Sequence, residues 1–221
     1  MLREIPGPDG PLEALLEEPS AERGVDRDGR VILGVQTPRA AVVFAHPHPQ
    51  FGGTMHTKVV YHATKALGRI GCAVLRFNFR GVGASAGTHD NGDGERDDFT
   101  AGLDFMRARY PDVPLWAAGM SFGSWIALNV GAADARVNAL LGIAMPASRD
   151  FSAVARSTKP KFFIHGERDE TCPLAEVRAF YASAAEPKEL VVIDAADHLF
   201  DGKVGEVADA IEDLLADWGT T

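Results

Sequence analysis

The chain has 221 residues and a net charge of −9, from 22 Lys and Arg against 31 Asp and Glu. This acidic balance, without any cluster of basic residues, argues against a nucleic-acid backbone or an anionic membrane surface as a partner. The 46% hydrophobic and 24% charged shares are those of an ordinary folded protein, and the length fits one domain over residues 1–221.

The sequence carries no segment that predicts export or membrane insertion. No apolar run approaches the ~20 residues that a helix needs to cross a bilayer, and the first residues are charged and interrupted by Pro6, unlike a secretory signal. Two cysteines, Cys72 and Cys172, are too few for a disulfide framework or a Cys-rich zinc site. We therefore expect a cytoplasmic location.

Apolar runs and stretches of helical periodicity alternate along the chain and predict its elements. One strand is expected early, at 12–17, and further strands at 31–35, 41–45, 73–77, 115–118, 139–144, 161–165 and 190–194. Helices are expected between them at 58–69, 95–109, 122–132, 174–184 and 204–218. Strands that are apolar on both faces and separated by helices predict an α/β fold, with a mostly parallel central sheet and helices on both faces.

A G-x-S-x-G motif at residues 119–123 lies between a predicted strand and a predicted helix. In that setting the serine, Ser121, would occupy a strained turn that lifts its hydroxyl above the sheet edge. Gly119 and Gly123 would let the strand and the helix approach where a Cβ would clash. The N-terminus of the helix would direct free N–H groups at the same place. Ser121 is therefore the candidate nucleophile.

A serine nucleophile needs a base to take its proton, and the base needs an acid to hold its tautomer. After a nucleophile of this kind the acid and then the base follow in sequence, each on a loop behind a strand. Of the seven histidines, His198 alone follows the last predicted strand, so it is the predicted base. Chemistry alone leaves the acid open among carboxylates near the ends of the last two strands: Glu167, Asp169, Glu170, Asp194 and Asp197.

Four parts of the sequence together resemble the α/β-hydrolase superfamily, in particular its small, lidless bacterial members, over about residues 40–218. Residues 46–54 resemble the family's turn after strand three, residues 76–85 its strand-four signature, and residues 119–123 its nucleophile elbow. Residues 165–169 with Pro173, and residues 197–200, resemble its acid and base loops. In the family's H-G-x-x-D pattern the acid falls on Asp169. The resemblance thus implies a triad of Ser121, His198 and Asp169.

The tetrahedral intermediate of such a reaction needs an oxyanion hole of two N–H groups. One is expected from Phe122, the residue after the nucleophile. The other is expected from the loop behind the strand at 41–45, where Pro47 and Pro49 have no N–H to give. His48 matches the third position of the family's H-G-x-P turn, so its backbone N–H is assigned as the second donor of the oxyanion hole. The N–H of Gln50 is the alternative. Pro47 stands where the family usually has glycine.

Three other patterns resemble metal-binding or cofactor-binding motifs but depart from them at key positions. No metal or cofactor is therefore predicted. His46 and His48 could suggest a metal site, but prolines flank His48 on both sides. The glycines at 81, 83 and 87 mimic a dinucleotide fingerprint with the third glycine one position late. Residues 90–95 resemble a calcium loop, but Gly92 and Ala101 occupy positions where ligands are needed.

The sequence therefore predicts a serine hydrolase that cleaves small carboxylic esters through an acyl-enzyme intermediate, with no cofactor. The 16 residues at 145–160 are too few for a lid domain, so the site should be open to small, soluble esters. Three alternatives remain: a thioesterase, a peptidase with the same triad, or a non-catalytic ligand-binding protein on a hydrolase scaffold. The physiological substrate and the oligomeric state, a homodimer included, are left open.

Overall fold

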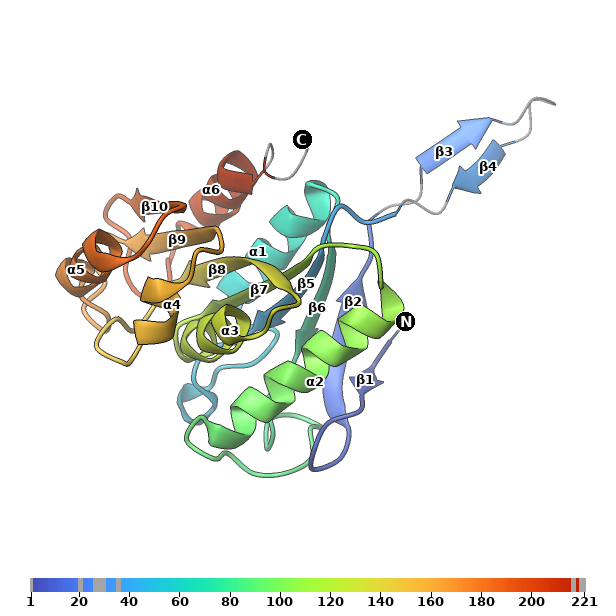
Figure 1. Ribbon diagram of the computed structural model, residues 1–221, viewed down its shortest axis with the longest axis horizontal. Coiled ribbons are helices and arrows are strands. Elements are labelled where there is room, and N and C mark those ends of the chain that lie inside the picture. The colour runs from blue at the N-terminus through green and yellow to red at the C-terminus, as the bar shows by residue number, and fades with distance from the viewer. Residues whose placement is uncertain (1, 20–21, 26–30, 35–36, 216–217, 219–221) are drawn as a thin grey trace.

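The computed structural model describes residues 2–19, 22–25, 31–34, 37–215 and 218. Its centre is an eight-stranded sheet with the strand order β1-β2-β6-β5-β7-β8-β9-β10 (Figure 1). In chain order these strands are β1 (Glu4–Ile5), β2 (Leu12–Glu17), β5 (Ala41–Ala45), β6 (Ala73–Phe77), β7 (Leu115–Met120), β8 (Val137–Ile143), β9 (Lys161–Gly166) and β10 (Lys188–Ile193). From β6 to β10 the sheet is parallel, and β1 and β2 add an antiparallel edge.

Helices cover both faces of this sheet (Figure 1). They are α1 (Lys58–Arg69), α2 (Asp93–Arg109), α3 (Phe122–Ala133), α4 (Ser152–Arg156), α5 (Leu174–Ser183) and α6 (Val204–Leu215), with a 3₁₀ turn at Pro49–Phe51. A separate antiparallel pair, β3 (Glu22–Val25) and β4 (Val31–Gly34), lies outside the main sheet. None of the described helices is both long enough and apolar enough to pass through a membrane.

The alternation of side chains along each strand divides the core into two layers. In β5, Val42 and Phe44 pack with α1 and α6 on one face, whereas Val43 and its neighbours pack with α2, α3 and α5 on the other. Because both faces are covered, all five residues of β5 are buried, as are all five of β6. The predicted α/β fold with a mostly parallel, two-sided sheet is confirmed.

The predicted bounds agree with the structure for some elements and differ by one or two residues for others. β2, β5, β6 and α1 have the predicted bounds, and β7 runs two residues further, up to the serine of the motif. β8 ends one residue early because Ala144 has a φ of 48°, which a strand does not allow. β10 begins two residues before its predicted start, and α2 begins at Asp93 because the Glu95 side chain accepts the Gly92 N–H at 2.7 Å.

Some expectations concern segments that were missed or that the structure does not describe. The short elements β1, β3, α4 and the 3₁₀ turn were not expected from the sequence. Of the strand expected at 31–35, residues 31–34 form β4, and residue 35 lies outside the described residues. Of the helix expected at 204–218, residues 204–215 form α6, and residues 216–217 lie outside them.

The close packing of α3 on the sheet can be tested by substituting one glycine in α3 and, as a control, one glycine in α1. A Cβ at Gly131 in α3 would lie 2.6 Å from the Ala117 Cβ and 2.7 Å from the Leu140 Cδ2, whereas a Cβ at Gly68 in α1 would have nothing within 4 Å. We expect Gly131→Ala to lower the free energy of unfolding by about 1–3 kcal/mol through overpacking. The matched control Gly68→Ala should raise it by up to about 1 kcal/mol, since alanine is the better helix former. Urea denaturation measures both, and a neutral Gly131→Ala would contradict the close approach.

Candidate active site

Ser121 sits in the sharp turn between the end of β7 and the start of α3. Its φ of 53° and ψ of −124° lie outside the regions that L residues favour, a conformation that costs about 1–3 kcal/mol. The turn is held by its own backbone: the Ser121 N–H donates to the Ile143 carbonyl at 2.8 Å, and its carbonyl accepts the Ser124 N–H at 2.9 Å. The surrounding bonds thus fix Ser121 in a strained position at the carboxyl edge of the sheet.

The two glycines of the motif allow the elements around Ser121 to touch. A Cβ on Gly119 would lie 2.5 Å from the Gly123 carbonyl carbon, and a Cβ on Gly123 would lie 2.4 Å from the His46 oxygen. Real Cβ atoms do not approach other atoms so closely, so larger residues would push the helix away from the strands. The close packing expected of these positions is present.

The structure brings Ser121, His198 and Asp169 together from three separate loops. His198 follows β10, and its Nε2 lies 3.0 Å from the Ser121 Oγ. Its Nδ1 lies 2.8 Å from the Asp169 Oδ2, and Asp169 follows β9. The Asp169 side chain is fully buried, and 16% of the His198 side chain is exposed. The three predicted residues therefore form one continuous chain of hydrogen bonds.

Backbone amides hold the Asp169 carboxylate in place. Its Oδ1 accepts the N–H of Thr171 at 3.0 Å and that of Cys172 at 2.8 Å, which leaves Oδ2 for His198. A carboxylate oxygen that accepts two amide hydrogens is fixed in direction as well as position. His165 supports the same loop, because its Nε2–H donates to the Cys172 carbonyl at 2.7 Å.

The other carboxylates considered from the sequence are occupied elsewhere or exposed. Glu167 accepts the Ala195 N–H at 2.8 Å, and Asp197 accepts the Leu199 N–H at 3.0 Å. Glu170 and Asp194 are exposed side chains. Within the described part of the chain, Asp169 is the carboxylate bonded to His198.

The loop behind β5 uses nearly all of its backbone N–H groups internally. Gln50 donates to the His48 Nδ1 at 3.2 Å, and Phe51 and Gly53 both donate to the His48 carbonyl at 3.1 Å. The N–H groups of His48 and Phe122 donate to no other group among the described residues. Of the two alternatives for the second oxyanion donor, His48 is thus the one with a free N–H.

A cavity of about 1070 Å³ opens in front of Ser121 and His198. His48 and Phe122 line it, with their ring centroids 4.8 Å apart, so both free N–H groups belong to residues on the wall of this space. Phe51 and Leu199 also line it and are 86% and 50% exposed, which places apolar surface at its opening. Polar walls are contributed by Arg149, Arg168, Glu170 and Asp197.

Comparisons with known proteins agree with this geometry. Residues 36–151 match the profile of the family described as "Serine aminopeptidase, S33". An uncharacterized protein of Rickettsia prowazekii is 36% identical over 198 residues, 85% of this chain and 83% of that protein. A serine hydrolase homologue from Coxiella burnetii is 35% identical, covering 96% of this chain and 95% of its own, with a TM-score of 0.84. The protein belongs to the α/β-hydrolase superfamily. A lidless serine hydrolase from Xanthomonas campestris is 34% identical, covering 99% and 94%, with a TM-score of 0.86.

This α/β hydrolase has no lid domain between β8 and β9. The connecting segment, residues 144–160, contains the five-residue helix α4 and short turns. Nothing in that segment is long enough to fold over the cavity. The site is open, as expected from the length of the segment.

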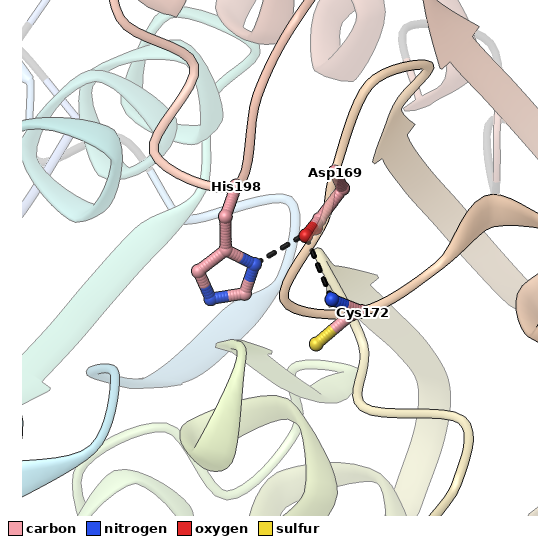
Figure 2. Close-up of side chains that lie close together, drawn as sticks. All are labelled: Asp169, Cys172 and His198. Carbon is pink, nitrogen blue, oxygen red and sulfur yellow. Dashed lines mark hydrogen bonds and ion pairs between the residues drawn. The ribbon is translucent and has the colours of Figure 1, made fainter.

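Cys172 is a neighbour of the site that the sequence did not single out. Figure 2 shows its sulfur beside the His198 ring and the Asp169 carboxylate. The Cys172 Sγ, a ring nitrogen of His198 and a carboxylate oxygen of Asp169 all lie within 4.8 Å of one another, close enough to be considered as metal ligands. Burial raises the pKa of the Cys172 thiol to about 12, so it is neutral near pH 7. A metal ion here would have to replace the hydrogen bond between His198 and Asp169. The only signal in the sequence was its place three residues after the acid.

His46 joins the two loops that border the α/β-hydrolase site. Its Nε2 accepts the Phe79 N–H at 3.0 Å, and its Nδ1–H donates to the Pro47 carbonyl at 2.6 Å. Both ring nitrogens are therefore used within the protein, and the ring is fully buried. Burial, the largest effect, lowers the pKa of His46 from 6.5 to about 4.

The depressed pKa of His46 predicts a loss of stability in acid. As the pH falls below 6.5, His46 is protonated in the unfolded chain, whereas in the folded protein it stays neutral until about pH 4. The free energy of unfolding should therefore fall by about 3 kcal/mol from this group between pH 7 and pH 4, with little further loss below. Urea denaturation at several pH values measures the slope, and His46→Gln should be flatter over this range. Equal slopes for the two proteins would contradict the assignment.

Proposed function

We propose that the protein is a carboxylesterase whose nucleophile is Ser121. The observation that carries the proposal is the unbroken chain from the Ser121 Oγ to the His198 Nε2, at 3.0 Å, and from the His198 Nδ1 to the Asp169 Oδ2, at 2.8 Å. The Asp169 side chain accepts the Nδ1–H of His198 and so keeps the ring proton on Nδ1. Nε2 is then the acceptor that faces the serine hydroxyl.

The reaction follows from these positions. Ser121 Oγ attacks the ester carbonyl carbon while its proton passes to His198 Nε2, and Asp169 stabilises the resulting imidazolium. His198 then gives that proton to the departing alkoxide, which leaves an acyl group on Ser121. Water attacks the acyl-enzyme with the same base, releasing the carboxylic acid and restoring the serine.

Two backbone N–H groups are assigned to the oxyanion. Phe122 is the first residue of α3, so its N–H points out of the positive end of the helix dipole. His48 supplies the second N–H from the opposite loop. Charge develops on the carbonyl oxygen only in the transition state, and the loss of one such donor costs about 3–4 kcal/mol there.

The open cavity favours small, soluble esters. A site without a lid needs no interface to open it, and the apolar side chains of Phe51, Phe122 and Leu199 suit a short acyl or aryl group. Est1E from Butyrivibrio proteoclasticus shares the fold at 18% identity and a TM-score of 0.80, a likeness that concerns the fold alone. The expected cytoplasmic location, and the absence of nucleic-acid and membrane partners, rest on the sequence and stay predictions.

A peptidase is the second candidate, favoured by the match to the serine aminopeptidase profile. An aminopeptidase must bind a free amino group, and Glu170 and Asp197 place carboxylates on the cavity wall. The two functions differ in their leaving groups, an alkoxide against an amine. A panel of p-nitrophenyl esters and aminoacyl p-nitroanilides separates them.

The esterase proposal predicts turnover of p-nitrophenyl butyrate that depends on the triad. Ser121→Ala should abolish it, and Asp169→Asn should lower kcat by about 10⁴-fold, because the wrong tautomer then faces the serine. The matched control Asp194→Asn changes an exposed carboxylate near the His198 loop that does not line the cavity, so its activity should stay within a few-fold of the unmodified protein. Full activity in Ser121→Ala would reject the proposal, and faster hydrolysis of the anilides would favour the peptidase.

A further inference from the structure

Arg149 stands on the cavity wall in the connection between β8 and α4, supported by aromatic rings. Its guanidinium carbon lies 4.3 Å from the centroid of the Trp125 ring and 5.9 Å from that of Phe122. Trp125 is in the first turn of α3, and Phe122 is the residue after the proposed nucleophile. A planar guanidinium stacked on aromatic rings keeps its N–H edges free for a planar anion.

The charge of Arg149 is not neutralised within the described residues. No carboxylate there forms an ion pair with it, and its one hydrogen bond is made by its backbone N–H, to the Pro146 carbonyl. Arg76, Arg80 and Arg136, by contrast, each form an ion pair with a carboxylate. A guanidinium that is positioned on rings yet unpaired at the edge of a cavity is suited to bind an anion from outside.

The charges on the rest of the cavity wall leave Arg149 as the anion-binding group. Arg168 and Glu170 lie on the loop of Asp169, and Asp197 lies on the loop of His198. The part of the cavity wall formed by these two loops therefore carries charges of both signs. Arg149 comes from a different loop, and its neighbours on the wall include Phe122 and Pro146, which carry no charge. The positive charge of Arg149 also reaches the site itself, since it contributes, after burial and His89, to lowering the pKa of His48.

We propose that Arg149 selects ester substrates that carry a carboxylate, which it binds beside Phe122 while Ser121 attacks the ester. This inference rests on the proposed esterase function and names its substrate class. Arg149 is exposed, so the pair it forms is open to solvent and weakens with salt. A charge-assisted, two-pronged contact of this kind is worth about a tenfold preference in kcat/KM.

The test compares a charged ester with a neutral one of the same length. The charged substrate is the mono-p-nitrophenyl ester of adipic acid. The neutral substrate is the same compound with its free carboxylate converted to a methyl ester, and the measured quantity is the ratio of the two kcat/KM values. Arg149→Gln should lower this ratio about tenfold, and Arg149→Lys should lower it less because the charge remains without the fork. A second pair, 4-acetoxybenzoate and phenyl acetate, tells whether the carboxylate is bound on the acyl or the alcohol side.

Arg96→Gln is the matched control. Arg96, in α2, also stacks on Trp125, at 4.7 Å, but it lines a different hollow with Thr100 and Asn129. Its loss should leave both ratios as they are, and a similar fall would mean that the effect passes through Trp125. Unchanged ratios in Arg149→Gln for both substrate pairs, with the variant folded by its thermal unfolding, would overturn the proposal.

Binding separates this inference from the esterase proposal. Adipic acid monomethyl ester is titrated by calorimetry into Ser121→Ala and into Ser121→Ala with Arg149→Gln. Weaker binding to the double variant supports Arg149 as the anion-binding residue even where no ester is turned over. Equal binding to the two proteins, at low salt, rejects that role whether or not the enzyme hydrolyses esters.

Discussion

The site depends on one constraint, the strained turn that presents Ser121 at the end of β7. A residue with a φ of 53° keeps that conformation only where its surroundings offset the strain. Here the offset comes from the packing of Gly119 against Gly123 and of Gly123 against the loop behind β5, with bonds to the Ile143 and Ser121 carbonyls. The same contacts bring the loop of His48 against the start of α3. The proposed nucleophile and the proposed oxyanion donors are therefore positioned by a single packing arrangement.

The parallel register carries the remaining parts of the site to the same edge. Ala45 pairs with Gly119, Gly119 with Gly142, and Ile193 with Gly166, so the strand ends lie in line. Four of the loops that leave this edge each add one component: the His48 loop, the elbow, the Asp169 loop and the His198 loop. Ala144 and Ala195, which follow two of these strands, also have positive φ values of 48° and 55°. Sharp turns at the strand ends keep the loops close to Ser121.

The sequence predicted most of the frame because burial on both faces leaves a plain apolar signal, as in β5 and β6. It missed β1, a two-residue edge strand, and misplaced the start of β10, where Lys188 and Glu189 hide the pattern at the other edge. The triad residues were predicted from their order along the chain and from the family resemblance. The choice between His48 and Gln50 needed the bond from Gln50 to the His48 ring. Arg149 reaches the site through its contact with Trp125, which is distant in sequence. Cys172 follows the acid by three residues, but only the structure shows that its sulfur lies close to His198 as well.

The central claim is that Ser121 is activated by His198 and Asp169. The most direct test exposes the folded protein to a fluorophosphonate, which reacts with activated serines, and follows the intact mass. The account predicts one adduct, mapped by peptide digestion to Ser121, absent from Ser121→Ala and formed far more slowly by Asp169→Asn. A folded protein that takes up no adduct, or one whose adduct persists in Ser121→Ala, would contradict the account and leave a binding role on a hydrolase scaffold.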